Sequence, residues 1–239
     1  MSATVATHPG RVRSENQDTA LVPGFCSTGL TGSPVTFHGP PDGAAAVYAV
    51  IDGMGGHSGG RTASQSAAFY LAECAARAAE ELDVTAMLDG ANRLLYEQME
   101  RDQRLLGMGA TIAGAAFGPR QATVFNVGDA RVYSCGDGYT MLLTTDDRSS
   151  PSSHAVTQSL GGATRLTSVS PHIVPLEPLR PGDRLLICSD GVTEVASFDD
   201  IGAALSAPDP GTAASRLLAT VLDGGAPDNV TFVVLEELV

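Results

Sequence analysis

The sequence contains no lysine, so all 14 of its basic residues are arginines. The 27 acidic residues outnumber them and give a formal net charge of −13 at pH 7. A protein that binds the phosphate backbone of nucleic acid needs a basic face, and this charge balance argues against one. We therefore expect no nucleic-acid partner. The acidic excess is compatible with a protein that holds cations.

Long apolar runs and paired cysteines are absent as well. No run reaches the roughly 20 apolar residues that a membrane-spanning helix requires, and residues 1–10 lack the basic-then-apolar pattern of a secretory signal. Without a C-x-x-C pair, the cysteines indicate neither a zinc knuckle nor a redox motif. Scattered thiols are typical of core residues in a reducing compartment. We expect a cytoplasmic monomer with no membrane partner.

Helical and strand patterns cover most of the 239 residues, of which 43% are hydrophobic. Apolar residues recur at helical spacing over 60–82 and 84–105, and candidate helices cover 199–205 and 212–222. Short apolar runs between glycine-containing turns predict consecutive antiparallel strands over 110–117, 122–127, 131–135 and 139–143. Further strands are expected over 44–51, 172–176, 184–188 and 230–235.

The order of these elements predicts the fold class. Strands occur in runs rather than alternating with helices, which favours an α+β layered sandwich over a doubly wound parallel sheet. The polar segment 144–153 predicts an exposed loop. No repeat or long linker divides the chain, so we predict a single domain over residues 1–239.

Four aspartates lie at the ends of predicted strands, each beside a glycine or an asparagine. Asp52 follows AVYAVI, Asp190 follows RLLICS, Asp129 follows TVFNVG, and Asp228 precedes Asn229 and VTFVVL. A single Asp-Gly dipeptide more often marks only a turn. Four such aspartates at strand ends predict that the carboxylates converge on one small volume.

Converging carboxylates need positive charge. They repel one another, which raises at least one pKa unless a cation is supplied. No lysine or arginine is adjacent to Asp52, Asp190 or Asp228 in the sequence, so a divalent cation is the economical solution. All-oxygen donors favour Mg²⁺ or Mn²⁺ over zinc or copper. The glycine after Asp52 or Asp190 would let a metal or water approach the backbone, and Gly53 would offer its carbonyl.

Two such ions about 3.5–4 Å apart would clamp a water and lower its pKa for in-line attack on phosphorus. Asp52 is our candidate for the ligand that bridges them. Near the N-terminus, Arg13 can grip phosphate oxygens with two N–H groups, and Asp18 can support the metal shell. Arg131 is expected to form a local ion pair with Asp129.

Seven segments in order resemble the bacterial metal-dependent Ser/Thr protein phosphatases of the protein phosphatase 2C type. Any one of them is a modest signal, but the ordered set is highly specific and spans nearly the whole chain. The segments are RSENQD (13–18), VIDGMGGHSGG (50–60), GATIAGAAF (109–117), NVGDARVY (126–133), TQSLGG (157–162), LLICSDGVTEV (185–195) and DNVTFVVLE (228–236).

The resemblance implies a four-layer α-β-β-α sandwich of two antiparallel sheets flanked by helices, with a binuclear Mn²⁺ or Mg²⁺ centre at one end. Carried over by position, Asp52 bridges both metals and the Gly53 carbonyl binds one of them. Asp190 and Asp228 complete the other metal's shell, and Asp18 assists through the inner water shell.

Two further positions follow from the resemblance. Arg13 matches the family's phosphate-binding arginine, and Asp129 matches the aspartate that holds a third, weaker metal in bacterial members. Glu194 lies where an aspartate usually helps that third metal, which is a departure from the pattern.

Three other departures concern the site and its rim. Met54 stands where eukaryotic members place a histidine that protonates the leaving alkoxide, which leaves a metal-bound water as the candidate acid. Gln17 occupies an often acidic position. The flap that members insert is reduced to about residues 145–153, which bears on substrate selection rather than on the chemistry.

Several polar residues near these motifs are given structural roles. His57 is displaced from the family's acid position and is interpreted as a structural residue. Thr111 and Ser189 are interpreted as packing residues, because no His or Lys motif accompanies Thr111 as a nucleophile.

The predicted function is Mn²⁺- or Mg²⁺-dependent hydrolysis of phosphoserine and phosphothreonine in proteins, by activated water and without a phosphoenzyme. The partners would be phosphoprotein substrates of a Ser/Thr kinase. A catalytically silent regulator that binds phosphoproteins is one alternative, and the retained Arg13 and aspartates count against it. A phosphatase for small phosphoesters is the other alternative, and the acidic net charge and the short flap are compatible with it.

Overall fold

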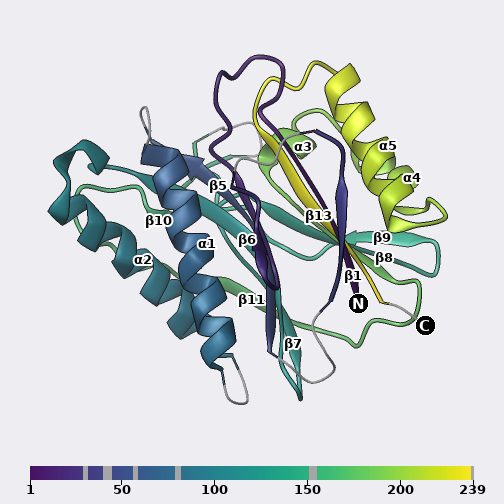
Figure 1. The fold of residues 1–239 in the computed structure, drawn as a ribbon, viewed down its shortest axis with the longest axis horizontal. Helices are drawn as coiled ribbons and strands as arrows, with labels where there is room; N and C mark the ends of the chain where they lie inside the picture. Colours follow the sequence, from purple (N-terminus) through teal and green to yellow (C-terminus); the bar gives the residue numbers. More distant parts are fainter. Residues whose placement is uncertain (29–31, 40–44, 56–58, 79–81, 151–154, 238–239) are drawn as a thin grey trace.

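The computed structural model describes residues 1–28, 32–39, 45–55, 59–78, 82–150 and 155–237. In this part of the chain, two antiparallel sheets lie face to face and a pair of helices covers the outer face of each (Figure 1). This arrangement is the predicted four-layer sandwich of the α+β class. The predicted strands and helices are all present, with differences at their ends.

The first sheet has the strand order β4-β1-β13-β12-β8-β9. Its members are β4 (Val35–His38), β1 (Ser2–His8), β13 (Val230–Glu236), β12 (Arg184–Cys188), β8 (Arg131–Gly136) and β9 (Tyr139–Leu142). The second sheet has the order β11-β7-β6-β5-β2-β3, and β10 (Leu160–Gly161) also pairs with β6. Its members are β11 (His172–Leu176), β7 (Ala122–Val127), β6 (Gly109–Phe117), β5 (Ala46–Met54), β2 (Thr19–Val22) and β3 (Phe25–Cys26).

Each helix pair buries its apolar face against one sheet. α1 (Gly59–Arg77) and α2 (Val84–Arg101) pack on the second sheet, followed by the short 3₁₀ helix η1 (Gln103–Leu105). α4 (Phe198–Leu205) and α5 (Pro210–Asp223) pack on the first sheet. A third apolar cluster fills the space between the sheets. Burial of these apolar faces on both sides of each sheet holds the four layers together.

Both long helices end earlier than their periodicity predicts. α1 ends at Arg77 rather than at residue 82, and α2 ends at Arg101 rather than at 105. At the second boundary, the Asp102 side chain accepts a hydrogen bond from the Arg104 amide and starts η1. A local side-chain bond therefore competes with continuation of the helix.

The N-terminal strand β1 was not predicted, although it pairs with β13 along its whole length. Its sequence SATVATH has few large apolar residues. Small residues, namely serine, threonine and alanine, fill most of its positions, and Thr4 and Thr7 are buried. The Thr7 hydroxyl bonds that of Thr231 across the pair at 2.7 Å. Hydroxyl pairing between strands thus replaces the apolar alternation that marks a strand in sequence.

The run of strands predicted over 110–143 is divided between the two sheets. β6 pairs with β7 and β8 pairs with β9, but the chain crosses from one sheet to the other between β7 and β8. Gly128 makes this crossing with φ of 97°, and a Cβ there would meet the Thr111 side chain. The crossing places Asp129 at the end of the sandwich.

The prediction that segment 144–153 is an exposed loop is wrong for much of its described part. Thr144 is only 8% exposed, and the Arg148 side chain only 11%. Residues 151–154 lie outside the described residues. Among the helices that are described, none is long and apolar enough to span a membrane.

Candidate functional site

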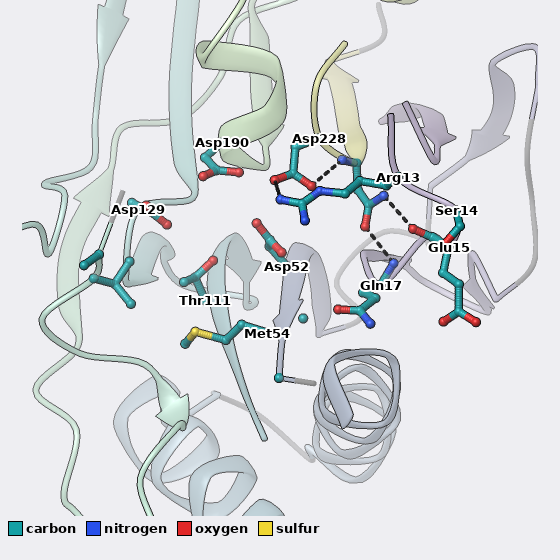
Figure 2. Close-up of a pocket in the computed structure, with 15 residues that line it drawn as sticks. Arg13, Ser14, Glu15, Gln17, Asp52, Met54, Thr111, Asp129, Asp190 and Asp228 are labelled. Atoms are coloured by element: carbon teal, nitrogen blue, oxygen red, sulfur yellow. Dashed lines mark hydrogen bonds and ion pairs between the residues drawn. The ribbon is translucent and has the colours of Figure 1, made fainter. Parts of the chain in front are cut away.

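Four of the predicted aspartates meet at one end of the sandwich, where ends of both sheets come together (Figure 2). Asp52 lies near the end of β5, opposite Thr111 of β6. Asp190 follows β12 after one residue, Ser189, and begins the short helix α3 (Asp190–Thr193), and Asp228 precedes β13. Asp129 lies in the crossing between the sheets. Convergence of the four strand-end carboxylates is therefore observed.

These aspartates and Arg13 line an open cavity of about 830 Å³. Figure 2 shows Asp52, Asp190 and Asp228 pointing toward one another, with Arg13 on the Asp228 side. Asp18 lies just before β2, only 6% exposed, and does not line the cavity. Glu194 is exposed at the end of α3 and does not line it either.

The carboxyl groups at the centre raise one another's pKa. Asp52 lies close enough to Asp18 and to Asp190 that the three carboxyl groups shift one another's pKa. Burial, followed by the charges of Asp18 and Asp190, raises the pKa of Asp52 well above the usual aspartate range. Burial is also the main cause that raises the pKa of Asp18 to about 6, which the Ser189 hydroxyl opposes. Without a cation, the centre therefore favours protonated carboxyls.

The pKa of Asp190 is raised as well. Burial and the nearby charges of Asp129 and Glu194 raise the pKa of Asp190 to about 7. Glu194 thus acts on Asp190 through its charge.

One carboxylate oxygen at the centre has no partner. Oδ2 of Asp18 accepts a hydrogen bond from the Ser189 hydroxyl at 2.9 Å, whereas Oδ1 is buried with no hydrogen bond. An orphaned buried oxygen is costly unless a donor or cation satisfies it. Together with the raised pKa values, it marks a centre that is short of positive charge. The oxygen-only donor set fits Mg²⁺ or Mn²⁺.

The carboxylates are nevertheless not arranged as a closed metal cage. No group of three or more His, Cys, Asp or Glu side chains in the described ranges stands ready to enclose an ion. Two arginines account for part of this. Arg13 Nη2 lies 2.6 Å from Asp228 Oδ2, and Arg148 Nη2 lies 3.5 Å from Asp190 Oδ2. Arginines from distant segments therefore supply positive charge here, although none is adjacent to Asp52, Asp190 or Asp228 in the sequence.

Arg13 lies at the rim of the cavity, as a phosphate-binding arginine would. Its side chain is 57% exposed. The hydrogen bond to Asp228 and the charge of that carboxylate raise the pKa of Arg13 further, so the guanidinium stays charged. A planar guanidinium held by one N–H edge keeps other donors for an incoming oxyanion.

Arg148 was missed by the sequence analysis because it lies in the segment interpreted as an exposed loop. Its Nε donates to Asp129 Oδ2 at 2.8 Å. The predicted pair of Arg131 with Asp129 is wrong. Arg131 instead forms two hydrogen bonds with Asp146, at 2.9 and 2.6 Å. The two arginines thus bind different carboxylates, and only Arg148 reaches the centre.

The glycines after Asp52 and Asp190 have a packing role in addition to the one predicted. A Cβ on Gly53 would collide with the Gly60 carbonyl, and a Cβ on Gly191 would collide with the Asn229 carbonyl. Close approach of two backbone segments requires glycine at both positions. A Cβ on Gly60 would also crowd the Gly53 carbonyl oxygen at 2.7 Å, so Gly60 keeps the space beside that oxygen free.

Asn229 also holds the site together and was not identified from the sequence. Its Oδ1 accepts from the Gln17 amide at 2.8 Å, and its Nδ2 donates to the carbonyls of Pro9 and Glu15 at 3.0 and 2.8 Å. These bonds attach the segment that carries Arg13 to the start of β13. The sequence feature that could have identified Asn229 is its position directly after Asp228.

Two of the three polar residues that were given structural roles, Ser189 and Thr111, lie within the described ranges. Ser189 bonds Asp18, so it positions a carboxylate rather than only packing. Thr111 lines the cavity, and its buried hydroxyl oxygen has no hydrogen bond. His57 lies outside the described residues. Met54 lines the cavity, and Figure 2 shows its sulfur turned away from Asp228.

Comparison with known proteins gives one family for this arrangement. The family described as protein phosphatase 2C matches residues 36–223. The serine/threonine protein phosphatase PstP of Mycobacterium tuberculosis is 34% identical over 217 residues, which are 80% of this chain and 40% of PstP. The chain therefore spans about two fifths of the length of that relative. The serine/threonine phosphatase stp of Listeria monocytogenes is 26% identical, over 99% of this chain and 96% of its own.

A solved structure also matches over the full length. The catalytic domain of the serine/threonine protein phosphatase PstP, in complex with two manganese ions, superimposes with a TM-score of 0.76 at 28% identity and covers 100% of both chains. The family match covers most of the chain, and the fold agrees throughout. This chain belongs to the protein phosphatase 2C family.

Proposed function

We propose that the chain is a single catalytic domain over residues 1–239 that hydrolyses phosphoserine and phosphothreonine in proteins, with two Mn²⁺ or Mg²⁺ ions. The observation that carries this proposal is the group of buried carboxylates short of positive charge, beside an open cavity with an arginine at its rim. The two manganese ions in the similar PstP structure support a function that depends on two metal ions.

Most of the proposed metal ligands are the carboxylates at the centre, which have too little positive charge around them. Asp52, whose pKa is raised by burial and by the charges of Asp18 and Asp190, is the proposed bridging ligand. The Gly53 carbonyl would serve one ion, Asp190 and Asp228 the other, and Asp18 would act through water. When bound, a pair of such ions supplies a water with a lowered pKa for direct attack on phosphorus. This route needs no phosphoenzyme.

The chain's own residues would orient the substrate. Arg13 presents guanidinium donors at the rim, where they can hold two phosphate oxygens and fix the phosphorus for in-line attack. Its bond to Asp228 holds the side chain in this place before substrate arrives. Thr111 also lines the cavity, and its buried hydroxyl oxygen has no hydrogen bond.

The proposed partners are phosphoprotein substrates of a Ser/Thr kinase, met in the cytoplasm by a monomer, with no nucleic acid or membrane involved. The relatives are named as serine/threonine phosphatases, which supports this substrate class. The charge of −13 disfavours a nucleic-acid surface.

Release of inorganic phosphate from a phosphothreonine peptide, measured with and without Mn²⁺, tests the proposal. Turnover should require the metal and be lost in Asp190→Asn, a variant that keeps the size of the side chain. Asp137→Asn is the matched control, because Asp137 is exposed and pairs with the exposed Arg180. It removes the same charge and should keep full activity.

The alternatives give different results in the same assay. A silent regulator would show no turnover with any divalent metal while still binding the phosphopeptide. A small-ester phosphatase would hydrolyse p-nitrophenyl phosphate with a much higher kcat/KM than the peptide. Either result would overturn the proposed function.

A further inference from the structure

Arg148 lies between carboxylates that the sequence assigns to a metal. Its Nε and Nη2 both lie 2.8 Å from Asp129 Oδ2, and Nη2 lies 3.5 Å from Asp190 Oδ2. Its Nε also lies 4.0 Å from Asp146 Oδ2. The guanidinium is therefore surrounded by three acidic groups. The side chains of Arg148 and Asp129 are only 11% and 4% exposed, so solvent screens the pair little.

The segment that carries Arg148 is anchored on both sides. The Asn126 side chain donates to the Thr145 carbonyl at 2.7 Å, and the Asp147 amide donates to the Gly128 carbonyl at 2.9 Å. Arg148 itself forms an isolated bridge with Val156. These bonds fix the backbone against the crossing between β7 and β8. The Arg148 guanidinium is thus positioned by the fold rather than free to sample solvent.

The neighbouring side chain of Asp147 strengthens this anchor. Its carboxylate accepts from the Gly128 amide at 2.8 Å and from Gln158 Nε2 at 2.7 Å, and His172 Nε2 lies 2.9 Å from its other oxygen. Asp146 is held in turn by Arg131. Each acidic neighbour of Arg148 in the segment therefore has its own fixed partner. Asp129 and Asp190 are left as the partners of Arg148.

A third metal does not fit the residues predicted for it. Asp129 directs Oδ2 to the guanidinium, and Glu194, the other residue assigned to that ion, is exposed at the end of α3. A cation bound by Asp129 beside Asp190 would have to displace Arg148 from a mostly buried ion pair. Displacement would leave the guanidinium mostly buried without its carboxylate partner, which is strongly unfavourable.

We propose that Arg148 is a built-in cation that takes the place of the third metal, so that this chain binds two ions at its centre and not three. The proposal rests on the proposed function for the other two ions. An arginine supplies charge and N–H donors but no open coordination position. Neutralisation of Asp129 and of one side of Asp190 is then permanent, and independent of the metal concentration.

Counting bound Mn²⁺ tests the proposal without an activity assay. Isothermal titration calorimetry and the loss of the free-Mn²⁺ EPR signal give the stoichiometry. The wild type should bind two ions per chain. Arg148→Gln should bind three, because it opens the Asp129 carboxylate, and the double variant Arg148→Gln, Asp129→Asn should return to two.

Two controls separate charge from position. Arg148→Lys keeps a cation beside Asp129 and should stay at two ions. Arg180→Gln removes one positive charge from an exposed pair elsewhere and should also stay at two. Circular dichroism spectra and melting curves would show that each variant is folded.

Three Mn²⁺ ions in the wild type, or no gain in Arg148→Gln, would overturn the inference while leaving the proposed function intact. No Mn²⁺ bound by the wild type would instead overturn the proposed function. One titration therefore distinguishes failure of this inference from failure of the proposed function.

Discussion

The guanidinium of Arg13 donates to Oδ2 of Asp228 over 2.6 Å, although 215 positions separate the two residues in the sequence. The bond connects the N-terminal segment to the start of β13 at the rim of the cavity (Figure 2). It places a charged donor beside a proposed metal ligand. The Arg13 side chain would therefore contact both Asp228 and the phosphate of the substrate.

Replacement of Arg13 by alanine should lower kcat/KM for a phosphothreonine peptide roughly 10- to 100-fold, since a hydrogen bond to a charged group contributes about 1.5–3 kcal/mol. The number of bound Mn²⁺ ions should not change. Steady-state kinetics and calorimetry measure the two quantities. Arg61→Ala removes the same charge from an exposed pair with Glu15 and should leave kcat/KM within about twofold. An unchanged kcat/KM in Arg13→Ala would remove Arg13 from the site.

The stability of the metal-free protein should increase as the pH falls. Asp18 and Asp190 have pKa values of about 6 and about 7 in the folded protein, above the ordinary value of 3.8. The folded chain therefore holds protons that the unfolded chain has released. The stability from these groups is fully present below the unfolded value and is lost as the pH rises through about 6 to 7.

Melting curves in EDTA between about pH 5.5 and about pH 8 measure this effect. The Tm should be higher at the acidic end, by roughly 2–4 °C for each kcal/mol. The double variant Asp18→Asn, Asp190→Asn should weaken the dependence, because it removes two of the titrating groups. A Tm that rose between pH 6 and 8 in the metal-free wild type would contradict the prediction.

Gly191→Ala should destabilise the protein, because the new Cβ would collide with the Asn229 carbonyl beside Asp228. Overpacking of this kind costs about 1–3 kcal/mol or more, and movement of β13 relative to α3 would also weaken Mn²⁺ binding. Urea denaturation and calorimetry measure the two losses. Gly59→Ala is the matched control, since its Cβ would lie 3.4 Å from the Met108 Cβ, an ordinary contact. A Gly191→Ala protein as stable as this control would contradict the account.

Arg184→Met should lower the free energy of unfolding without changing the metal site. Arg184 bonds Glu236 through Nε at 2.6 Å and the Leu205 carbonyl through Nη1 at 2.6 Å, and its side chain is 7% exposed. Loss of one partner of a buried pair costs about 3–5 kcal/mol.

Urea denaturation measures this loss. Arg180→Met, which breaks an exposed pair with Asp137, should cost less than about 1 kcal/mol. Equal stabilities of the two variants would show that the buried pair contributes nothing.

Local signals accounted for much of the site. The aspartates were identified because each follows or precedes a short apolar run, and such runs form strands wherever they are long enough to pair. The convergence of these strand ends was also predictable, since strands of one sandwich begin and end at common edges. The partners of the aspartates were not predictable in this way. Arg148 and Asn229 act through side chains whose targets lie in distant segments of the chain.

Hydrophobic periodicity and glycine turns act over a few neighbouring residues, so the strand runs, the two long helices and the acidic ends of the strands follow from the order of the amino acids. That Arg148 binds Asp129, although Arg131 is nearer in the chain, follows only from how the two sheets are stacked. The chain crosses between sheets just after β7, and this crossing turns Asp129 toward a segment that folds back from β9. Ion pairs form by distance in space, and that distance is set only when the two sheets stack.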